Sequence, residues 1–538
     1  MQPDCKKKAV ILSPNWKNTI PKSDKMKQRK LHSMMRTAWM GLCASLIVCS
    51  CGQGNSHKEF QSRTVRDYSD GNARMRQEYS DFRDKANAAY AEKMLDNWGQ
   101  YISNPPESKV QEIPDIPPVV KPYGISAPRE EKESRYAEII KSIKESEAPE
   151  PVIPFLEIYA SDIPGEPVTE APEDTAGTFL FYGTRLKIRF AEENSFKIVS
   201  TDNRSLSRLW KKLSEKSFDT VLTDMLRAKD NLDLCDWAYM KMVRRFSDFV
   251  FPDRNNESVY LSFYLLCQSG FKVRLAREMN DGDIHLLVGV DGTILEQKYW
   301  LLDGVKYFLA DQFPYNDLLI CNIDYPKENP LRLQNTSSNR FREDLSESRT
   351  FRSEYDDLSA SCSVNRNLLS FYEDYPAFFM DNNNYSTWKY YAETPLSETV
   401  KEALYPALKE AISGKSQIDA VNTILHFVQT AFSYKTDAEV WGKERSFFAD
   451  ETVYYPYCDC EDRAILYSVL VRDLIGLDVV LLYYPGHLAA ATNVEEGSGE
   501  YYEIDGRKFF VTDPTFINGD LGDTMTSVSG YSAIVIEI

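Results

Sequence analysis

The segment 461–475 constrains the fold most, because it is long enough for a helix and has almost no polar face. Its apolar residues, among them Ile465, Val469 and Leu474, are spread around most of a helical wheel. A helix that is apolar on nearly all sides has to be covered by other elements. Asp459 is expected to cap this helix, with Asp462 three residues later in the pattern of a capping box. The sequence therefore predicts a central, buried helix.

Two apolar runs follow this helix, "DVVLLYY" and "HLAAATNV", and Pro485-Gly486 between them is a strong turn signal. His487 begins the second run. A further hairpin, turning at Asp505-Gly506, leads to "KFFVTDPT", in which Asp513 stands at a strand end before a proline. A helix followed by antiparallel strands predicts an α+β domain.

The predicted helix begins at a cysteine, which raises the question of a reactive thiol. Cys460 would lie in the first turn, where unpaired backbone N–H groups favour a thiolate. The neighbouring acids oppose this effect, so a nucleophilic role also needs a base. A histidine and an aspartate on adjacent strands can face a helix-end cysteine, and the aspartate would then hold the imidazole while His487 takes the thiol proton.

Each of these residues also has an ordinary structural interpretation. A cysteine at a helix start is more often buried filler than a nucleophile. A histidine on an apolar strand is usually a core residue with satisfied hydrogen bonds, and an aspartate before proline is commonly part of a turn. The combination of the three, and not any one of them, favours an intact catalytic triad.

The order of these motifs resembles that of a known family. Cys-Glu-Asp-Arg-Ala at a helix start, then a histidine, then Asp-Pro-Thr, is similar to the transglutaminase-like superfamily of papain-related cysteine enzymes, over roughly Ile418 to Phe516. The resemblance implies a papain-like, transglutaminase-type catalytic domain over 396–538. It implies Cys460 as nucleophile, His487 as base and Asp513 as the residue that orients the base.

One position departs from the family pattern. The family usually has glycine two residues before the nucleophile, and this chain has Cys458. We expect Cys458 either to crowd the site or to form a regulatory link with Cys460. The resemblance also implies an oxyanion hole from the Cys460 N–H and an upstream aromatic side chain, for which the candidates are Tyr454, Tyr455, Tyr457 and Trp441.

An earlier segment looks like a second copy of the same arrangement. It has a helix around Trp237–Phe249 and then an apolar helix and strands from 252 onward. Matching Gly476 to Gly270 sets His285 against His487 and Asp311 against Asp513, and it sets Arg254 against Cys460. Because arginine cannot accept an acyl group, 175–325 is predicted to be a degenerate transglutaminase-like domain kept for scaffolding or substrate binding. Chance similarity between two α/β segments is the alternative.

The rest of the chain divides by composition. Residues 52–170 are predicted to be a helical and proline-rich linker region, with an amphipathic helix around Tyr79–Met94, a charged helix at Arg129–Glu147 and proline-rich stretches that form linkers or a strap on another domain. "GTFLFYGTRLKIRF" predicts a β-hairpin, and "RSLSRLWKKLSEKSFDTVLTDMLRAK" predicts a helix. The connecting region, 326–395, is predicted to be polar loop with short strands.

The N-terminus has the pattern of a secretory signal. The basic run Lys25–Arg36 precedes an apolar stretch and then "VCSCG". This resembles the lipobox of bacterial lipoproteins, so 1–51 is predicted to be a lipoprotein signal peptide and Cys51 the lipidated residue, with Cys49 as the weaker alternative. A transmembrane anchor is the other interpretation, but the apolar run is short for a bilayer. The chain is thus expected to be anchored by lipid to a membrane of the bacterial cell envelope.

Composition excludes some functions. A net charge of -18, with no basic stripe beyond the leader, argues against a nucleic-acid partner. Four of the ten cysteines lie in the leader, and the six others and the four histidines beyond the leader are scattered, without the paired spacing of a zinc site or a disulfide framework. No metal and no cofactor is therefore predicted, and nothing in the sequence indicates an oligomeric state.

Two functions remain from the sequence, and a third is weaker. The first is a cell-envelope cysteine enzyme that acts on amide bonds of a protein or peptide substrate through a thioester. The resemblance slightly favours hydrolysis, as in a cysteine protease or amidase, over transfer to an amine by an acyltransferase. The second is a non-catalytic envelope scaffold that binds a partner with its two domains. The third is a metal-binding or redox role for Cys458 and Cys460.

Overall fold

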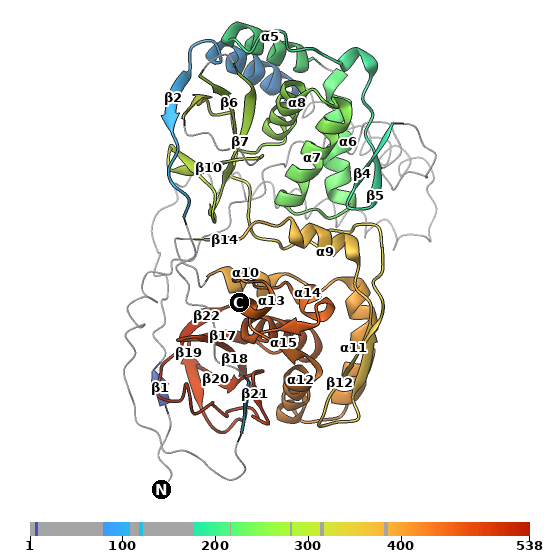
Figure 1. Cartoon of the computed structure of the whole chain (residues 1–538), viewed down its shortest axis with the longest axis vertical. Helices are drawn as coiled ribbons and strands as arrows, with labels where there is room; N and C mark the ends of the chain where they lie inside the picture. The colour runs from blue at the N-terminus through green and yellow to red at the C-terminus, as the bar shows by residue number, and fades with distance from the viewer. Residues whose placement is uncertain are drawn as a thin grey trace, which may run out of the picture. The chain divides into compact units, whose positions relative to one another are not determined.

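The computed structural model describes residues 6–8, 79–107, 118–121, 177–215, 217–279, 282–311, 317–380 and 386–538. These residues form a mixed structure of helices and largely antiparallel sheets (Figure 1), so the α+β class is confirmed. Apart from residues 6–8, the predicted leader lies outside the described residues, as do Cys51 and the charged helix at 129–147. Within the described part, no helix is both long and apolar enough to cross a membrane.

The first sheet belongs to the earlier predicted domain, except for its edge strand Trp98–Ile102, which comes from the region 52–170 that the sequence predicted to be a linker. Its strands are, in spatial order, β2 (Trp98–Ile102), β11 (Asp317–Cys321), β6 (Val273–Glu278), β7 (Ile284–Val290), β10 (Val305–Leu309) and β9 (Tyr299–Leu302). All neighbouring pairs are antiparallel. A core cluster lies on this sheet and contains Ala276, Leu287, Trp300, Leu302, Tyr307, Leu318 and Ile320.

The helices before this sheet follow the predicted order with one difference. A helix over 79–93 is present, as are the hairpin β4 (Thr178–Phe181) and β5 (Thr184–Lys187), and the helices α7 (Asp236–Val250) and α8 (Asn255–Gln268). The helix predicted after the hairpin is two helices, α5 (Asn203–Leu213) and α6 (Ser217–Asn231). The Ser214 hydroxyl donates to the Trp210 carbonyl at 2.8 Å, a local bond that competes with continuation of the helix.

The connecting region contains more helix than the sequence indicated. The hairpin β12 (Arg349–Arg352) and β13 (Ser359–Cys362) matches the prediction of short strands, and β14 (Phe378–Phe379) pairs with β8 (Thr293–Ile294). Two short helices, α9 (Arg366–Glu373) and α10 (Ser386–Glu393), were missed. Asn365 caps α9 by accepting the Asn367 N–H, a signal that the polar composition of the segment obscured.

The second sheet belongs to the later predicted domain. Its order is β1 (Lys6–Lys8), β19 (Tyr501–Ile504), β20 (Arg507–Thr512), β18 (His487–Asn493), β17 (Val479–Tyr484) and β22 (Ile534–Glu537). The turns at Pro485-Gly486 and Asp505-Gly506 join β17 to β18 and β19 to β20, as predicted. Between β1 and the other strands the chain forms the helices α11 (Glu398–Ile412), α12 (Gln417–Ala431), α13 (Asp437–Val440), α14 (Ala449–Tyr454) and α15 (Cys460–Ile475).

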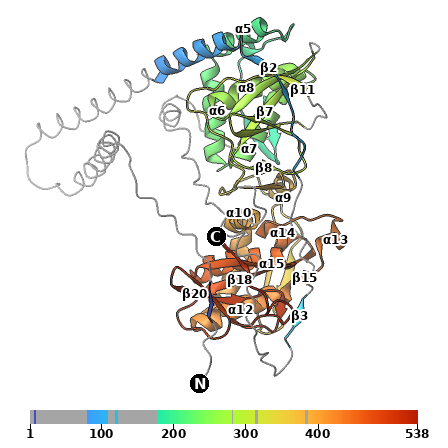
Figure 2. The ribbon, with the colours of Figure 1, turned by 90° about the vertical axis from the view of Figure 1, so that its left-hand side faces the viewer.

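The central helix α15 is enclosed, as its sequence predicts. Its residues are buried without interruption from Cys460 to Val471, and it packs against α12, α10, α14 and the strands β17 and β18 (Figures 1 and 2). Asp459 is the N-cap and its N–H donates to the Asp462 carboxylate at 3.2 Å. Gly476 ends the helix at a φ of 75°, where a side chain would be strained. These caps fix where the first helical residue, Cys460, lies.

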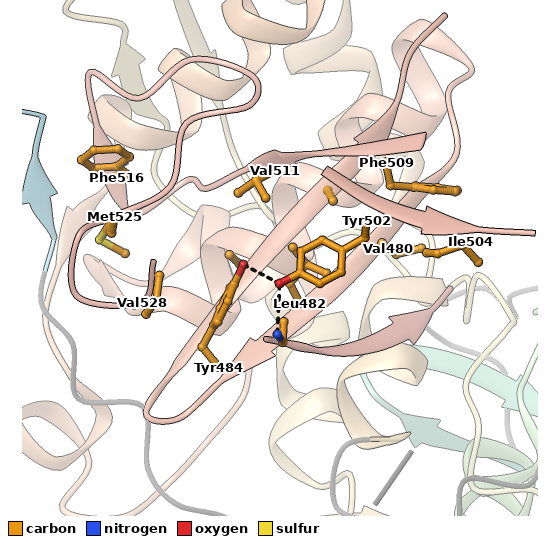
Figure 3. Packing of buried hydrophobic residues seen from close by; sticks show 13 residues of the cluster. Val480, Leu482, Tyr484, Tyr502, Ile504, Phe509, Val511, Phe516, Met525 and Val528 are labelled. Carbon is orange, nitrogen blue, oxygen red and sulfur yellow. Dashed lines mark hydrogen bonds between the residues drawn. The ribbon is translucent and has the colours of Figure 1, made fainter. Parts of the chain in front are cut away.

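A second apolar layer supports the same sheet (Figure 3). Alternate residues of β17 and β18 face a cluster that includes Phe516, Met525 and Val528. Within it, the Tyr502 hydroxyl accepts the Ala533 N–H at 3.0 Å and lies 3.2 Å from the Tyr484 hydroxyl. The strands that carry the candidate site are therefore packed on both faces.

The proline-rich region contributes a short strand to the later domain. β3 (Val119–Val120) pairs in parallel with β21 (Phe516–Ile517), and the Val119 N–H donates to the Thr515 carbonyl. An ion pair joins Lys121 to Asp523. Residues 118–121 thus form a strap on another part of the chain, one of the two roles predicted for this segment.

The two sheets share one topology. In each half a helix precedes a buried helix, and the buried helix packs on two strands of its sheet. In the later half α12 precedes α15, which packs on β17 and β18. In the earlier half α7 precedes α8, which packs on β6 and β7. The order β19-β20-β18-β17-β22 matches β9-β10-β7-β6-β11 strand for strand. Gly270, like Gly476, has a positive φ after the buried helix. This equivalence agrees with the repeat inferred from the sequence.

Candidate active site

His487 and Asp513 are in contact because their strands are neighbours. His487 is the first residue of β18, directly after the Pro485-Gly486 turn, and Asp513 directly follows β20, which pairs with β18. The Asp513 Oδ2 lies 2.8 Å from the His487 Nε2, and the two side chains are almost completely buried. A carboxylate at this distance fixes the orientation of the ring and stabilises a protonated imidazole.

The backbone around Asp513 is held in place by buried donors. The Thr515 N–H donates to the Asp513 Oδ1 at 2.9 Å, and the Gln429 side-chain amide donates to the Asp513 carbonyl at 3.1 Å. Arg463, in the Cys-Glu-Asp-Arg motif, donates to the Pro514 carbonyl at 3.3 Å and to the Phe432 carbonyl at 2.5 Å. The helix motif and the Asp-Pro-Thr turn are therefore joined directly, and Asp513 is oriented before any substrate arrives.

Cys460 is the first helical residue of α15 and is fully buried. Its thiol donates to the Glu461 Oε2 at 3.4 Å. Burial raises the pKa of the Cys460 thiol well above its usual value, and the nearby Asp459 adds to the increase. The Leu488 N–H points at the sulfur and opposes the increase. In this arrangement Cys460 is a protonated thiol.

The three predicted residues meet at the start of β18, but the thiol is not bonded to the imidazole. The Leu488 N–H that contacts the Cys460 sulfur belongs to the residue after His487. Among the described residues no hydrogen bond joins Cys460 to His487, and the buried His487 Nδ1 has no hydrogen-bond partner. The histidine thus has one nitrogen on Asp513 and one nitrogen available to a second group.

Cys458 is not linked to Cys460. Both cysteines are free, and the Cys458 thiol points at the Ser433 carbonyl at 3.7 Å. This contact follows from the pairing of β16 (Tyr457–Cys458) with β15 (Ser433–Tyr434). Cys458 therefore belongs to a short ladder beside the site.

The aromatic residues proposed from the sequence for the oxyanion hole make contacts of their own. Tyr455 accepts from Arg445 and donates to Glu373, Tyr457 lies under Lys435, and Trp441 lies under Arg445. A different residue lies near the thiol: burial raises the pKa of Tyr434, and proximity to Cys460 contributes to the increase. Sequence reasoning missed Tyr434, because it lies 26 residues before Cys460 and reaches it only through the pairing of β15 with β16.

The earlier half does not assemble a comparable site. Its His285 contacts Glu278 at 3.2 Å, whereas Asp311 pairs with Arg244 at 2.8 Å, so the sequence match of His285 and Asp311 to His487 and Asp513 does not extend to a pair in space. Arg254 is the N-cap of α8, one position before the first helical residue, and donates to Phe196 and Glu257. The arginine at the start of this buried helix pairs with Glu257 and offers no nucleophile.

No protein-family model matches this chain, and no curated protein and no solved structure is similar to it at a significant level.

Proposed function

We propose that the later domain is a cysteine acyl-transfer enzyme of the transglutaminase-like type, acting on amide bonds of a protein or peptide. The observation that carries the proposal is the buried His487–Asp513 pair, which leaves the His487 Nδ1 without a hydrogen-bond partner among the described residues, beside the start of the Cys460 helix. A buried polar nitrogen without a partner costs about 1 to 3 kcal/mol, a cost that a functional role offsets.

The proposed chemistry begins with transfer of the thiol proton from Cys460 to the His487 Nδ1. The thiolate then attacks the carbonyl carbon of the substrate amide, and a carbon–sulfur bond forms. The imidazolium, stabilised by Asp513, gives its proton to the leaving amine as the carbon–nitrogen bond breaks. Water attacks the resulting thioester with His487 as base, which releases the carboxylic acid and restores the thiol. An amine in place of water yields a new amide.

The first step needs a rearrangement of one side chain. The Cys460 thiol donates to Glu461, so it has to turn from that carboxylate to the His487 nitrogen before proton transfer. Rotation about the Cys460 side-chain torsion is the movement that we propose for this step. The Cys460 N–H, in the first turn of α15, has no acceptor within its own helix and is the donor that we assign to the developing oxyanion.

The proposal is tested by trapping the acyl-enzyme. A p-nitrophenyl ester supplies an activated acyl group, and intact-mass spectrometry detects the acyl adduct while released p-nitrophenolate gives its rate. We expect a Cys460 adduct that is absent from Cys460→Ser and forms about 10²- to 10⁴-fold more slowly in His487→Ala. Turnover of the adduct with and without a primary amine distinguishes hydrolysis, the outcome that the resemblance favours, from transfer. Equal rates in wild type and His487→Ala would refute the proposal.

A non-catalytic scaffold is the second candidate, and a specific observation favours it. The thiol is bonded to Glu461 and its pKa is raised, which is the opposite of an activated cysteine. The earlier half keeps the same topology without a nucleophile, so the architecture serves in this chain without acyl chemistry. A scaffold predicts that no acyl adduct forms at Cys460 and that Cys460→Ser retains every binding property of the chain.

We further propose that the chain is held at a membrane of the bacterial cell envelope by lipid on Cys51. The support is the sequence pattern alone, since Cys51 lies outside the described residues. Metabolic labelling with a fatty-acid probe tests it. We expect label in wild type and loss of label in Cys51→Ser. Retention of label in Cys51→Ser with loss in Cys49→Ser would move the modification to the other cysteine.

A further inference from the structure

The strap β3 lies against β21, the strand that directly follows the Asp-Pro-Thr turn (β3 is labelled in Figure 2). The ion pair between Lys121 and Asp523 joins positions that are 402 residues apart in the chain. The strap therefore comes from the predicted linker region, outside the domain that carries Cys460 and His487. It supplies no reacting group to the proposed mechanism, yet it contacts the part of the chain that orients the base.

The strap and the candidate site meet at the backbone of Thr515. The Thr515 N–H donates to the Asp513 Oδ1 at 2.9 Å, and the Thr515 carbonyl accepts the Val119 N–H at 3.3 Å. The Thr515 hydroxyl is buried and has no hydrogen-bond partner among the described residues. Because the side chain adds no hydrogen bond, the backbone bond to the strap is one of the interactions that fix the amide on Asp513.

A second contact of the strap leads to His487. The Val119 side chain packs against the apolar cluster that includes Phe516 and Tyr484 (Figure 3). The Tyr484 ring is stacked beside the His487 ring, with 6.4 Å between the ring centroids and 20° between the planes. Both members of the His487–Asp513 pair are thus supported by groups that the strap contacts.

The sequence of the strap suits docking that is reversible. Pro118 and Pro122 stand on either side of it, and because proline has no N–H, the ladder cannot extend through them. A residue before proline favours an extended backbone, so Lys121 loses little conformational freedom when it docks. The donors to β21 are the N–H groups of Val119 and Lys121. A contact of two backbone bonds, an ion pair and one half-buried side chain opens far more readily than a packed core.

We propose that residues 118–121 are a positioning element of the candidate active site, which holds the Thr515 amide and thereby orients Asp513 toward His487. The inference rests on the proposed function, since the orientation of Asp513 affects reactivity only if His487 is the base. When the strap is docked, the Asp513 carboxylate is in place for the imidazolium. When it undocks, the Thr515 carbonyl loses a donor and the Asp513 turn loosens, so the reactivity of Cys460 follows the docked fraction.

Proline at position 119 tests this coupling, because it removes the N–H that bonds Thr515. Val120→Pro is the matched control: the Val120 side chain is 59 % exposed, and in a ladder its N–H points away from β21. Val119→Ile keeps the donor and the apolar contact. In the full chain, hydrogen exchange at 515–517, followed by mass spectrometry, should be about 3- to 10-fold faster in Val119→Pro and unchanged in the other two variants.

The alkylation rate of Cys460 separates positioning from a general loss of stability. Val119→Pro should lower this rate by about 2- to 10-fold in a chain with His487, and should leave it unchanged in the His487→Ala background, because the effect passes through that residue. Equal exchange at 515–517 in Val119→Pro and Val120→Pro would overturn the inference. An equal fall in the alkylation rate with and without His487 would also overturn it, since the strap would then act on stability alone.

Failure of the proposed function gives a different result. In that case alkylation of Cys460 in wild type does not depend on His487, which overturns the effect of the strap on reactivity. The exchange rates at 515–517 need no activity, so they still decide whether the strap holds the turn.

Discussion

The contact between Arg463 and the Asp-Pro-Thr turn yields a quantitative prediction. Arg463 is 2 % exposed, and its guanidinium donates to the carbonyls of Pro514 and Phe432. Arg463→Met keeps most of the apolar stem that packs in the core and removes both donors. The turn that presents Asp513 to His487 then loses its only described link to the motif on α15.

The expected size of the effect follows from these bonds. A hydrogen bond from a charged donor contributes about 1.5 to 3 kcal/mol, and of the two Arg463 bonds only the one to Pro514 holds the turn. Relief from burying the guanidinium, whose Nε has no partner among the described residues, offsets part of this loss. The net destabilisation of the turn is about 1 to 2 kcal/mol. Since each 1.36 kcal/mol is tenfold, local opening becomes roughly 5- to 30-fold more frequent.

Native-state hydrogen exchange measures this opening directly. In Arg463→Met, the amides of 511–517, including the Thr515 N–H that binds Asp513, should exchange faster by that factor. Arg507→Met is the control, because Arg507 lies on β20 and its contacts, an exposed ion pair with Asp478 and the Phe509 ring, do not include the turn. Loss of such an exposed pair changes stability by about 1 kcal/mol or less. Exchange in Arg463→Met that equals that of the control would refute the structural role of Arg463.

Three more predictions concern stability and the second cysteine. Burial raises the pKa of Asp450 from 3.8 to about 6, so the folded state favours the neutral carboxyl group, and the stability of wild type falls as the pH rises from about 4 to 6. In urea unfolding, the free energy of unfolding of Asp450→Asn should therefore increase by about 3 kcal/mol relative to that of wild type between pH 4 and 7, and parallel pH profiles of the two proteins would contradict this. Tyr502→Phe leaves the Ala533 N–H unpaired and should lower the free energy of unfolding by about 1 to 3 kcal/mol, whereas Tyr501→Phe, whose hydroxyl has no hydrogen-bond partner among the described residues, should change it little. Cys458→Ser should leave the reactivity of Cys460 unchanged, since the Cys458 thiol points at the Ser433 carbonyl and is not linked to Cys460, and a changed alkylation rate would show that the two are coupled.

Local signals explain most of what the sequence predicted correctly. The all-round apolar pattern after Cys460 predicted a buried helix, and Pro485-Gly486 and Asp505-Gly506 placed the turns that bring His487 to a strand start. The contact of His487 with Asp513 follows from the pairing of β18 with β20, which their order in the chain made plausible. The same reasoning failed for α9 and for the break between α5 and α6. At both places a single hydrogen bond made by the side chain of Asn365 or Ser214 helps to set the helix end, and the composition of the segment does not reveal it.

The surroundings of the thiol were not predictable in the same way. Tyr434 and Asp437 reach the start of α15 through a two-residue ladder and a four-residue helix, and neither element has a periodic pattern. Gln429 lies on a buried helix, where its side chain looks like an ordinary polar residue in the sequence. The orientation of the Cys460 thiol toward Glu461 depends on a side-chain torsion, which no sequence pattern specifies.

The central claim, that Cys460 is activated by His487, is tested most directly by the alkylation rate of Cys460 against pH. Peptide mass spectrometry follows Cys460 and Cys458 in one experiment, so the second buried thiol is an internal reference. The account predicts that Cys460 is alkylated faster than Cys458, that this persists below the ordinary thiol pKa of about 8.5, and that the advantage is lost in His487→Ala. Alkylation of Cys460 that is no faster than that of Cys458, and is unchanged by His487→Ala, would contradict it and would leave the scaffold as the function of both halves.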